Sequence, residues 1–310
     1  MRYSLIIPHF NDPKRLERLL RSVPVQRADL EVLVVDDCSP DQPALEAVKA
    51  RWPMVRWLST AQNAGAGAAR NVGLGQARGE RLVFADSDDE FLPGAFDVFD
   101  DHVGNDDELV YFLAEAVQEV DGSPSNRAVR TNDLCHAYVN SPSEASLERL
   151  KLGHVVPVAK VYSRRFIVEK NILFEEVRIG DDVAFNVLAA LQARRVKVVA
   201  KPVYRIYRRP ESLMTNPSPE AFLECVAVKA RLASAVKEFG IKEAPSATGW
   251  MLASFAYGPR TVFRTWRLCL GSDLRIDVLR LFQFARWKTF LSNRLRERAE
   301  EKAASSRGRS

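Results

Sequence analysis

The chain has 310 residues, of which 46% are hydrophobic and 27% are charged, and its formal net charge is +5. This composition is typical of a folded protein and excludes a disordered or fibrous chain. The length fits one α/β domain of about 200 residues with a smaller annex. The sequence contains no run of about 18 uncharged apolar residues, so we predict no membrane span. The apolar run at residues 5–7 is too short for a signal peptide and predicts a first strand.

The positive charge is concentrated at the C-terminal end. Residues 259–310 contain 13 Lys and Arg against 5 Asp and Glu, whereas the rest of the chain is slightly acidic. An anionic partner would therefore be expected to bind there.

The cysteines are far apart and form no CxxC pair, so we predict neither a disulfide framework nor a zinc site. Their use fits a reducing cytoplasm as the location. The four are Cys38, Cys135, Cys225 and Cys269.

Apolar runs and helical patterns alternate along the first two thirds of the chain. Strands that alternate with helices form βαβ units, so the predicted fold is α/β, with a mainly parallel sheet flanked by helices. In chain order, the predicted elements are a strand at 5–7, a helix at 13–23, a strand at 30–35, a helix at 44–51, a strand at 55–58, a helix at 66–77, a strand at 81–85, a helix at 93–102, a strand at 109–113, a helix at 181–193 and a strand at 196–199.

Two features divide the chain. Residues 121–146 are polar and rich in turn-forming residues, which predicts a long loop or hairpin. The best boundary is the Asn-Pro-Ser-Pro sequence at residues 216–219. We therefore predict a first domain at residues 1–216, a helical C-terminal annex at residues 217–298 and a disordered tail at residues 299–310.

An acidic cluster directly follows the strand at 81–85, in the sequence Asp86-Ser87-Asp88-Asp89. Three carboxylates within four residues repel each other unless a cation neutralises them. Carboxylate oxygens are ligands suited to Mg²⁺ or Mn²⁺, and ligands of open α/β sheets bind beyond the C-terminal ends of strands. The alternative is an acidic turn that caps the following helix.

Two further predicted strands end in polar groups. Asp36 and Asp37 follow the strand at 30–35, and Pro8-His9-Phe10-Asn11 closes the first strand. Each segment alone is also typical of a turn or a helix cap. Because parallel neighbours bring their C-terminal ends to one edge, we expect these groups to share a site. His9 is expected to be a loop residue and not an acid or base.

A short glycine motif, Gly65-x-Gly67, could open a dinucleotide fingerprint. However, the third glycine position holds Arg70, and the motif follows the third predicted strand instead of the first. A Rossmann dehydrogenase is therefore disfavoured.

Taken together and in order, these motifs resemble the family-2 glycosyltransferases, which have a GT-A fold and use nucleotide-diphosphate sugars. The resemblance covers about residues 1–216 and leaves the last third uncovered. The motifs that carry it are Pro8-x-Phe10-Asn11, Val35-Asp36-Asp37-x-Ser39, Asn63-x-Gly65, Ala69-Arg70-Asn71-x-Gly73, Gly79-Glu80, Asp86-Ser87-Asp88-Asp89 and residues 160–165, 171–174, 180–186 and 207–212.

The resemblance implies roles for individual residues. Asp37 would accept a hydrogen bond from a uracil-type imide, Arg70 would approach the base or the phosphates, and Asp86 would lie near the ribose. Asp88 would hold the metal, Mn²⁺ or Mg²⁺, that bridges the diphosphate. The nucleotide-sugar-binding residues would be Pro8, Phe10, Asn11, Asp37, Arg70, Asp86 and Arg208.

The catalytic pair implied by the resemblance is Asp181 and Asp182, with Asp182 at the position usually assigned as general base. The family commonly has Glu-Asp here, so the choice between the two stays open. Consecutive helical residues project about 100° apart, so both cannot face one substrate. A single carboxylate that takes a hydroxyl proton favours one direct displacement with inversion. The alternative is plain capping of the helix N-terminus.

The remaining basic residues of this domain have two alternative interpretations, ligand binding and a solvated face. Tyr207, Arg208 and Arg209 could bind the leaving diphosphate or the acceptor, although adjacent arginines are more typical of a solvated face. The basic residues of the segment 160–165, Lys160 among them, are likewise expected on a solvated face.

The near-helical spacing of apolar residues in the annex predicts an amphipathic helix, with basic residues between the apolar ones. We favour packing of this helix on the catalytic domain or on a second subunit. The alternative is contact with an anionic membrane surface, and no nucleic-acid recognition motif is present. The apolar positions are Leu274, Val278, Leu281, Phe282, Ala285 and Trp287, and the basic ones are Arg275, Arg280, Arg286 and Lys288.

The resemblance and the chemistry together predict a metal-dependent inverting glycosyltransferase. It would move a sugar from a nucleotide-diphosphate donor to a glycan or lipid-linked acceptor. A UDP-sugar is the favoured donor, and GDP- and dTDP-sugars are the alternatives. The expected location is the cytoplasm, with peripheral contact at the inner face of the membrane as an option. One alternative is a sugar-phosphate nucleotidyltransferase, which would need a glycine-rich basic loop where residues 8–11 stand. The other is a non-catalytic binding module, against which Asp88 and Asp182 argue.

Overall fold

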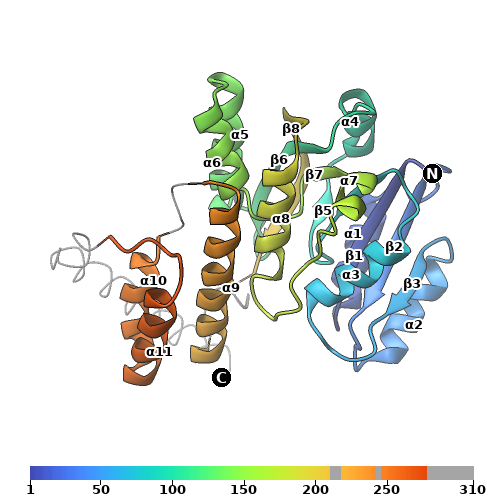
Figure 1. Cartoon of the computed structure of the whole chain (residues 1–310). Coiled ribbons are helices and arrows are strands. Elements are labelled where there is room, and N and C mark those ends of the chain that lie inside the picture. Colours follow the sequence, from blue (N-terminus) through green and yellow to red (C-terminus); the bar gives the residue numbers. More distant parts are fainter. Residues whose placement is uncertain (210–217, 242–245, 278–310) are drawn as a thin grey trace. The chain divides into compact units, whose positions relative to one another are not determined.

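The computed structural model describes residues 1–209, 218–241 and 246–277. The chain forms two compact units, Met1–Asn216 and Pro217–Ser310 (Figure 1). The predicted tail at 299–310 and most of the predicted amphipathic helix lie outside the described residues. The described start of that helix, residues 274–277, is not helical, because Arg275 forms a β-bridge with Ser246 instead.

The first unit contains an eight-stranded sheet in the order β3-β2-β1-β4-β7-β6-β8-β5. Four of the seven strand pairings within residues 1–209 are parallel, namely β1 with β2 and β4, β2 with β3, and β6 with β8. The predicted α/β fold class with a mainly parallel sheet is therefore confirmed. The strands are β1 (Tyr3–His9), β2 (Leu30–Asp36), β3 (Arg56–Ser59), β4 (Arg81–Phe84), β5 (Glu90–Phe91), β6 (Leu109–Gln118), β7 (Lys160–Ser163) and β8 (Val196–Arg208).

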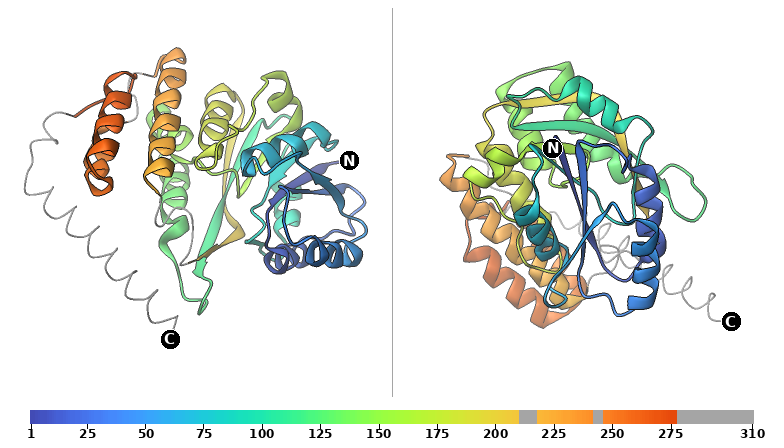
Figure 2. Two further views of the ribbon diagram at one scale, coloured as in Figure 1. Left: turned by 90° about the horizontal axis from the view of Figure 1, so that it is seen from below. Right: turned by 90° about the vertical axis from the view of Figure 1, so that its right-hand side faces the viewer.

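Helices cover both faces of this sheet (Figures 1 and 2). Successive strand residues point to opposite faces, so Leu5 and Ile7 of β1 join one core with α1, α2 and α4, while Ile6 joins another with α3 and α5 to α8. The helices are α1 (Pro13–Ser22), α2 (Gln42–Arg51), α3 (Ala66–Gln76), α4 (Ala95–His102), α5 (Val129–Asn140), α6 (Glu144–Gly153), α7 (Arg164–Glu169) and α8 (Asp181–Gln192).

The local sequence explains why β1, β2 and α1 form. Every residue of β1 and β2 is buried, which is the pattern of parallel strands covered on both faces. Asp12 caps α1 by accepting from the backbone N–H of Arg15, and Pro13 occupies the first turn, where its missing N–H is not needed.

The expectation of a loop or hairpin at 121–146 is wrong. This stretch contains a 3-10 turn, Asn126–Ala128, the whole of α5 and the start of α6. Only Cys135 of α5 is fully buried, so the segment lacks the apolar period that predicts a helix. A tertiary contact holds it instead: the side chain of Asn132 accepts from the N–H of Ala114 and donates to its carbonyl, at 3.1 and 2.8 Å.

The second unit is helical in its described part. It contains α9 (Pro219–Glu238), α10 (Thr248–Ala253), the 3-10 turn Ser254–Tyr257 and α11 (Pro259–Leu270). Side chains of α9, α10 and α11 share a small apolar core around Phe222, Val226 and Met251. None of the helices in the described ranges combines the length and apolar character that a membrane span requires.

Close packing of α3 against β1 gives the first testable prediction. A Cβ at Gly73 would lie 2.5 Å from Cγ2 of buried Ile6, whereas a Cβ at Gly75 would meet nothing within 4 Å. We expect Gly73→Ala to cost about 1–3 kcal/mol through overpacking. Gly75→Ala, the matched control, should gain up to about 0.5–1 kcal/mol from helix propensity. Urea unfolding of both variants measures this, and equal effects would contradict the packing.

Candidate active site

The C-terminal ends of β1, β2 and β4 meet at one edge of the sheet, as predicted. Their register pairs His9 with Asp36 and Ile6 with Phe84, so residues 8–11, 36–39 and 86–89 leave the sheet side by side. The hydroxyl of Ser39 connects the first two segments, because it accepts from the N–H of Asn11 at 2.7 Å and donates to the carboxylate of Asp36.

Asp37 organises the loop that leads from β3 into α3. Its carboxylate accepts from the hydroxyl of Thr60 at 2.7 Å and from the N–H groups of Ala64 and Gly65 at 3.0 and 2.7 Å. Gly65 has a φ of +92°, which favours glycine at this position. Asp37 is buried, and its three hydrogen bonds fix the backbone beside it.

The nucleotide-sugar-binding residues predicted at the end of β1 differ in exposure. Phe10 is an exposed aromatic side chain, with 49% of its surface accessible, whereas Pro8 lies inside the sheet and Asn11 is exposed. Only Phe10 among them offers a free ring face for stacking. His9 is not a loop residue as expected, because it ends β1 and is buried, and burial lowers its pKa.

A buried guanidinium joins three segments that are distant in the sequence. Arg70 of α3 donates to Asp181 in the first turn of α8 at 2.5 Å and to Asp86 after β4 at 2.6 Å. The ring of Phe174 lies 5.3 Å from the guanidinium carbon. Arg70 therefore neutralises two carboxylates that would otherwise repel each other. Sequence reasoning selected all three charged residues but not the contacts among them.

Asp182 is the other carboxylate of the pair and has a different environment. No salt bridge from the described residues neutralises it. Burial, followed by the charge of Asp181, raises the pKa of Asp182 to about 7, while Arg70 opposes the shift. A carboxylate with a pKa near 7 can take a proton at neutral pH. Asp181 itself is engaged by Arg70, so the two residues are not equivalent.

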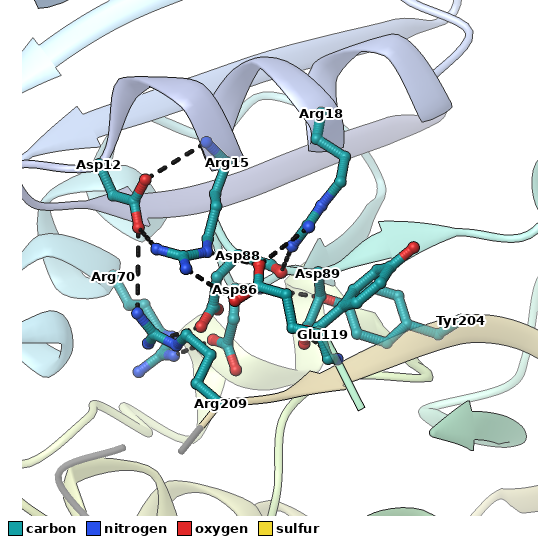
Figure 3. Close-up of polar contacts among 11 residues, drawn as sticks. Asp12, Arg15, Arg18, Arg70, Asp86, Asp88, Asp89, Glu119, Tyr204 and Arg209 are labelled. Carbon is teal, nitrogen blue, oxygen red and sulfur yellow. Dashed lines mark hydrogen bonds and ion pairs between the residues drawn. The ribbon is translucent and has the colours of Figure 1, made fainter. Parts of the chain in front are cut away.

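The acidic segment after β4 is tied to β8 (Figure 3). The carboxylate of Asp89 is buried and accepts from the backbone N–H of Tyr207 at 2.9 Å, and the hydroxyl of Tyr204 accepts from the N–H of Asp86 at 2.9 Å. Burial raises the pKa of Asp89 well above its usual range. Asp89 therefore anchors the segment, and Asp86 and Asp88 are left at the sheet edge.

Asp88 forms an ion pair with the guanidinium of Arg209, at 2.6 Å (Figure 3). Burial and the charge of Asp86 raise the pKa of Asp88, and Arg209 opposes this. A cationic group thus already occupies the position where the resemblance implies a metal. In the described ranges, no group of three His, Cys, Asp or Glu side chains is arranged to hold an ion. The carboxylate donor chemistry fits Mg²⁺ or Mn²⁺ only if a bound diphosphate and water supply further oxygens.

Sequence reasoning missed a set of charged groups around Asp88. Glu119, just beyond β6, accepts two hydrogen bonds from Arg15 at 2.6 and 2.7 Å and one from Arg18 at 3.0 Å. Arg18 also donates to the carbonyl of Asp88 and stacks on the ring of Tyr207, at 3.8 Å. Arg15 and Arg18 lie on one face of α1 at a spacing of three, which is the signal that could have revealed them.

The basic residues at the end of β8 differ in their contacts, and one other basic residue needs correction. Arg208 donates to Asn126 at 3.4 Å, whereas Arg209, just beyond β8, pairs with Asp88. Lys160 is completely buried instead of solvated. Arg165, in contrast, is exposed and pairs with Glu169.

An α/β sheet with acidic groups beyond its parallel strands is the architecture of nucleotide-binding enzymes. The family described as Glycosyl transferase family 2 matches residues 4–169, more than half of the chain. The chain therefore belongs to glycosyl transferase family 2.

Curated relatives agree with this assignment. The chain is 30% identical over 238 residues to poly(ribitol-phosphate) beta-N-acetylglucosaminyltransferase TarS of Staphylococcus aureus, covering 72% of this chain and 39% of TarS. It is 29% identical over 204 residues to succinoglycan biosynthesis protein ExoO of Rhizobium meliloti, covering 58% of this chain and 53% of ExoO. The matched region is thus a minor part of TarS and about half of ExoO.

Solved structures share the fold. TarS 1–349 of S. aureus in complex with UDP superposes with a TM-score of 0.54 at 27% identity, over 75% of this chain and 65% of that one. The complex of TarS 1–349 with UDP-GlcNAc gives 0.60 at 24% identity, over 87% and 73%. Mannosyltransferase PcManGT of Pyrobaculum calidifontis, in complex with GDP-Man and Mn²⁺, gives 0.53 at 16% identity, over 97% and 86%. The predicted GT-A fold is confirmed.

The bridge made by Arg70 gives a prediction about stability. Arg70→Met leaves Asp86 and Asp181 without their cation, and removing one partner of a buried ion pair costs about 3–5 kcal/mol. Arg165→Met removes an exposed pair on α7 and should change the free energy of unfolding little. Urea unfolding of both variants tests the contrast, and equal losses would show that the bridge is not structural.

The raised pKa of Asp182 predicts a pH-dependent stability. The pKa is about 7 in the folded chain against an ordinary 3.8. The free energy of unfolding of the wild type should therefore fall as pH rises from about 4 to about 8, because Asp182 ionises more easily in the unfolded chain. Asp182→Asn has no carboxylate to ionise and should lack this loss. Relative to the wild type, the free energy of unfolding of the variant should rise by up to about 4 kcal/mol between about pH 4 and pH 8.

The matched control for that measurement is Asp181→Asn. Burial also raises the pKa of Asp181, but Arg70 opposes this shift, so Asp181→Asn should give a smaller pH-dependent gain in stability than Asp182→Asn. Thermal unfolding of the two variants and the wild type across this pH range is the measurement. A pH-independent difference between Asp182→Asn and the wild type would contradict the assignment of the shifted group.

Proposed function

We propose that the protein is a metal-dependent, inverting glycosyltransferase that moves a sugar from a UDP-sugar to a glycan or lipid-linked acceptor by direct displacement. The observation that carries the proposal is that two adjacent acids, Asp181 and Asp182, differ in their ion pairing and in their pKa. Asp181 is neutralised by Arg70, while Asp182 is left without a salt bridge among the described residues and has a pKa near 7. The same guanidinium holds Asp86, which belongs to the predicted metal and nucleotide segment.

The nucleotide would bind at the edge formed by β1, β2 and β4. Phe10 would stack on the base, and Asp37, next to Pro8 and Asn11, would accept from its imide N–H while keeping the loop at residues 60–65 in place. Asp86 would lie near the ribose. The relative TarS, solved with UDP and with UDP-GlcNAc, supports a UDP-sugar as the donor.

Asp88 would hold Mn²⁺ or Mg²⁺ together with oxygens of the diphosphate. When bound, the cation would stabilise the negative charge that grows on the leaving diphosphate. Arg209 must leave Asp88 for this to happen, and its guanidinium would then be free to pair with a phosphate. Arg208, beside Asn126, would stay outside this group unless the end of β8 moves.

Asp182 would act as the general base. A sugar hydroxyl is a poor nucleophile until a positioned carboxylate takes its proton as the new bond forms. A pKa near 7 leaves a large fraction of Asp182 ionised at neutral pH and still basic enough to accept that proton. The only acid that we assign to proton transfer among the described residues is Asp182, and Asp181 beside it is engaged by Arg70. One base without a paired nucleophile favours a single displacement, which inverts the anomeric carbon.

The names of the relatives support the proposed acceptor class. TarS is named as a poly(ribitol-phosphate) beta-N-acetylglucosaminyltransferase and ExoO as a succinoglycan biosynthesis protein, which agrees with a glycan or lipid-linked acceptor here. We propose residues 1–216 as the catalytic domain and residues 217–298 as an annex that contacts a second copy or the membrane. The location would be the cytoplasm, with peripheral contact at the inner face of the membrane and no nucleic-acid partner.

The decisive experiment compares three variants in release of UDP from UDP-GlcNAc with Mn²⁺. We expect Asp88→Ala and Asp182→Asn each to lower turnover at least about a hundredfold. In thermal shift, Asp182→Asn should keep the stabilisation by UDP and Mn²⁺, and Asp88→Ala should lose the part that requires Mn²⁺.

The control in that comparison is Glu46→Gln, which changes an exposed carboxylate of α2 that pairs with neighbouring Lys49 within the part of the chain that the structure describes. It should retain wild-type turnover. Full activity in both Asp88→Ala and Asp182→Asn, with intact folds, would disprove the site. Stabilisation of the wild type by other nucleotides but not by UDP would disprove the donor.

A further inference from the structure

Lys160 is an ammonium group in the interior of the first unit. Its side chain, from β7, has no exposed surface. Its Nζ donates to the carbonyl of His154 at 2.7 Å and to Oδ1 of Asn186 at 2.8 Å, and lies 4.8 Å from the ring centre of Tyr111. Lysine is almost never fully buried without partners of this kind.

The contacts of Nζ satisfy its hydrogen-bond donors. Nζ meets two oxygen acceptors and the negative face of an aromatic ring. Burial lowers the pKa of Lys160 well below its usual range, and the charges of Cys135 and Asp182 oppose this shift.

Asn186 connects Lys160 to the base. It lies one turn after Asp182 on α8 and is also fully buried. Its Oδ1 accepts from Lys160 and, at 2.7 Å, from the hydroxyl of Tyr162, while its Nδ2 donates to the backbone carbonyl of Asp182 at 2.8 Å. The first turn of α8 is thus attached to β7 by a continuous buried chain of hydrogen bonds.

Stability alone does not account for this chain. Taking an ammonium out of water is costly, and apolar residues of similar volume commonly stabilise a core as well as a buried charge does. The arrangement instead fixes one specific element, the first turn of α8, at the point where it carries Asp182. A buried polar network in which every group is satisfied rigidifies its surroundings.

We propose that Lys160 is a positioning residue for the transfer reaction: through Asn186 it holds the first turn of α8, and with it the carboxylate of Asp182, in the orientation that takes the proton of the attacking hydroxyl. This inference rests on the proposed function of Asp182.

The charged groups that surround Asp182 set the direction of the expected effects. Asp181 and Asp86 raise the pKa of Asp182, and Arg70 lowers it. Lys160, when charged, favours the ionised carboxylate, because Asp182 in turn favours the charged form of Lys160. Removing its charge should therefore move the pKa of Asp182 further upward.

The test variant is Lys160→Met, which keeps the length of the apolar stem and removes the ammonium. With UDP-GlcNAc, Mn²⁺ and water as the acceptor, we expect kcat to fall about ten- to a hundredfold with KM for the donor unchanged. The acid limb of the pH profile should move upward by about half a unit to one unit. Calorimetry should give the wild-type affinity for UDP with Mn²⁺. A folded variant with wild-type kcat and an unmoved profile would overturn the proposal.

Two further variants separate positioning from general damage to the core. Asn186→Asp keeps the acceptor for Lys160 but loses the N–H donor to the carbonyl of Asp182, so it should also lose kcat with KM unchanged. Tyr111→Phe removes a buried hydroxyl that has no partner in the described structure and keeps the ring face, so it should behave as the wild type. Equal losses of kcat in all three variants would show that the cluster is only structural.

A substrate-free measurement distinguishes failure of this inference from failure of the proposed function. The pH at which Asp182→Asn begins to gain stability reports ionisation of Asp182 in the folded chain. Comparing that midpoint between Lys160 and Lys160→Met backgrounds needs no turnover, and we expect it to rise in the variant. An unmoved midpoint would refute the role of Lys160, whereas full activity of Asp182→Asn would refute the proposed function instead.

Discussion

The arrangement of the site depends on one buried guanidinium. Arg70 donates to Asp86 and to Asp181, and these three residues come from α3, the end of β4 and the start of α8. Without that cation, the two carboxylates would repel each other in a partly desolvated space. Close packing of Gly73 on Ile6 brings α3 near enough to β1 for Arg70 to reach both partners. The geometry of the helix packing and the electrostatics of the site are therefore coupled.

The same bridge makes the two acids of α8 different. Arg70 compensates Asp181 directly, and Asp182 is left with burial and two negative neighbours, which raise its pKa to about 7. A shift of this size comes from environment, since an exposed aspartate titrates near 4. Buried Lys160 is connected to the backbone carbonyl of Asp182 through Asn186. The neighbour of Asp182 is thus held by Arg70, and its backbone is held by Asn186.

At the opposite side of the sheet edge, arginines surround the acidic segment after β4. Arg209 pairs with Asp88, and Arg18 donates to the carbonyl of Asp88 and stacks on Tyr207. Glu119 in turn holds Arg15 and Arg18. This concentration of guanidinium groups around carboxylates suits a site that exchanges internal ion pairs for an anionic, metal-bound ligand. Membership of glycosyl transferase family 2 agrees with that character.

The sequence by itself determined the alternation of strands and helices, the acidic ends of β2 and β4, and the convergence of these ends, because period, apolar content and the geometry of parallel strands are local properties. It did not determine α5, whose helix is held by Asn132 on β6 without an apolar period of its own. It also did not determine which acid of α8 is engaged in an ion pair with Arg70. The pairing of Arg209 with Asp88 and the burial of Lys160 were likewise not determined. These properties arise from contacts between residues far apart in the chain, and desolvation and charge pairing exist only once the fold has brought them together.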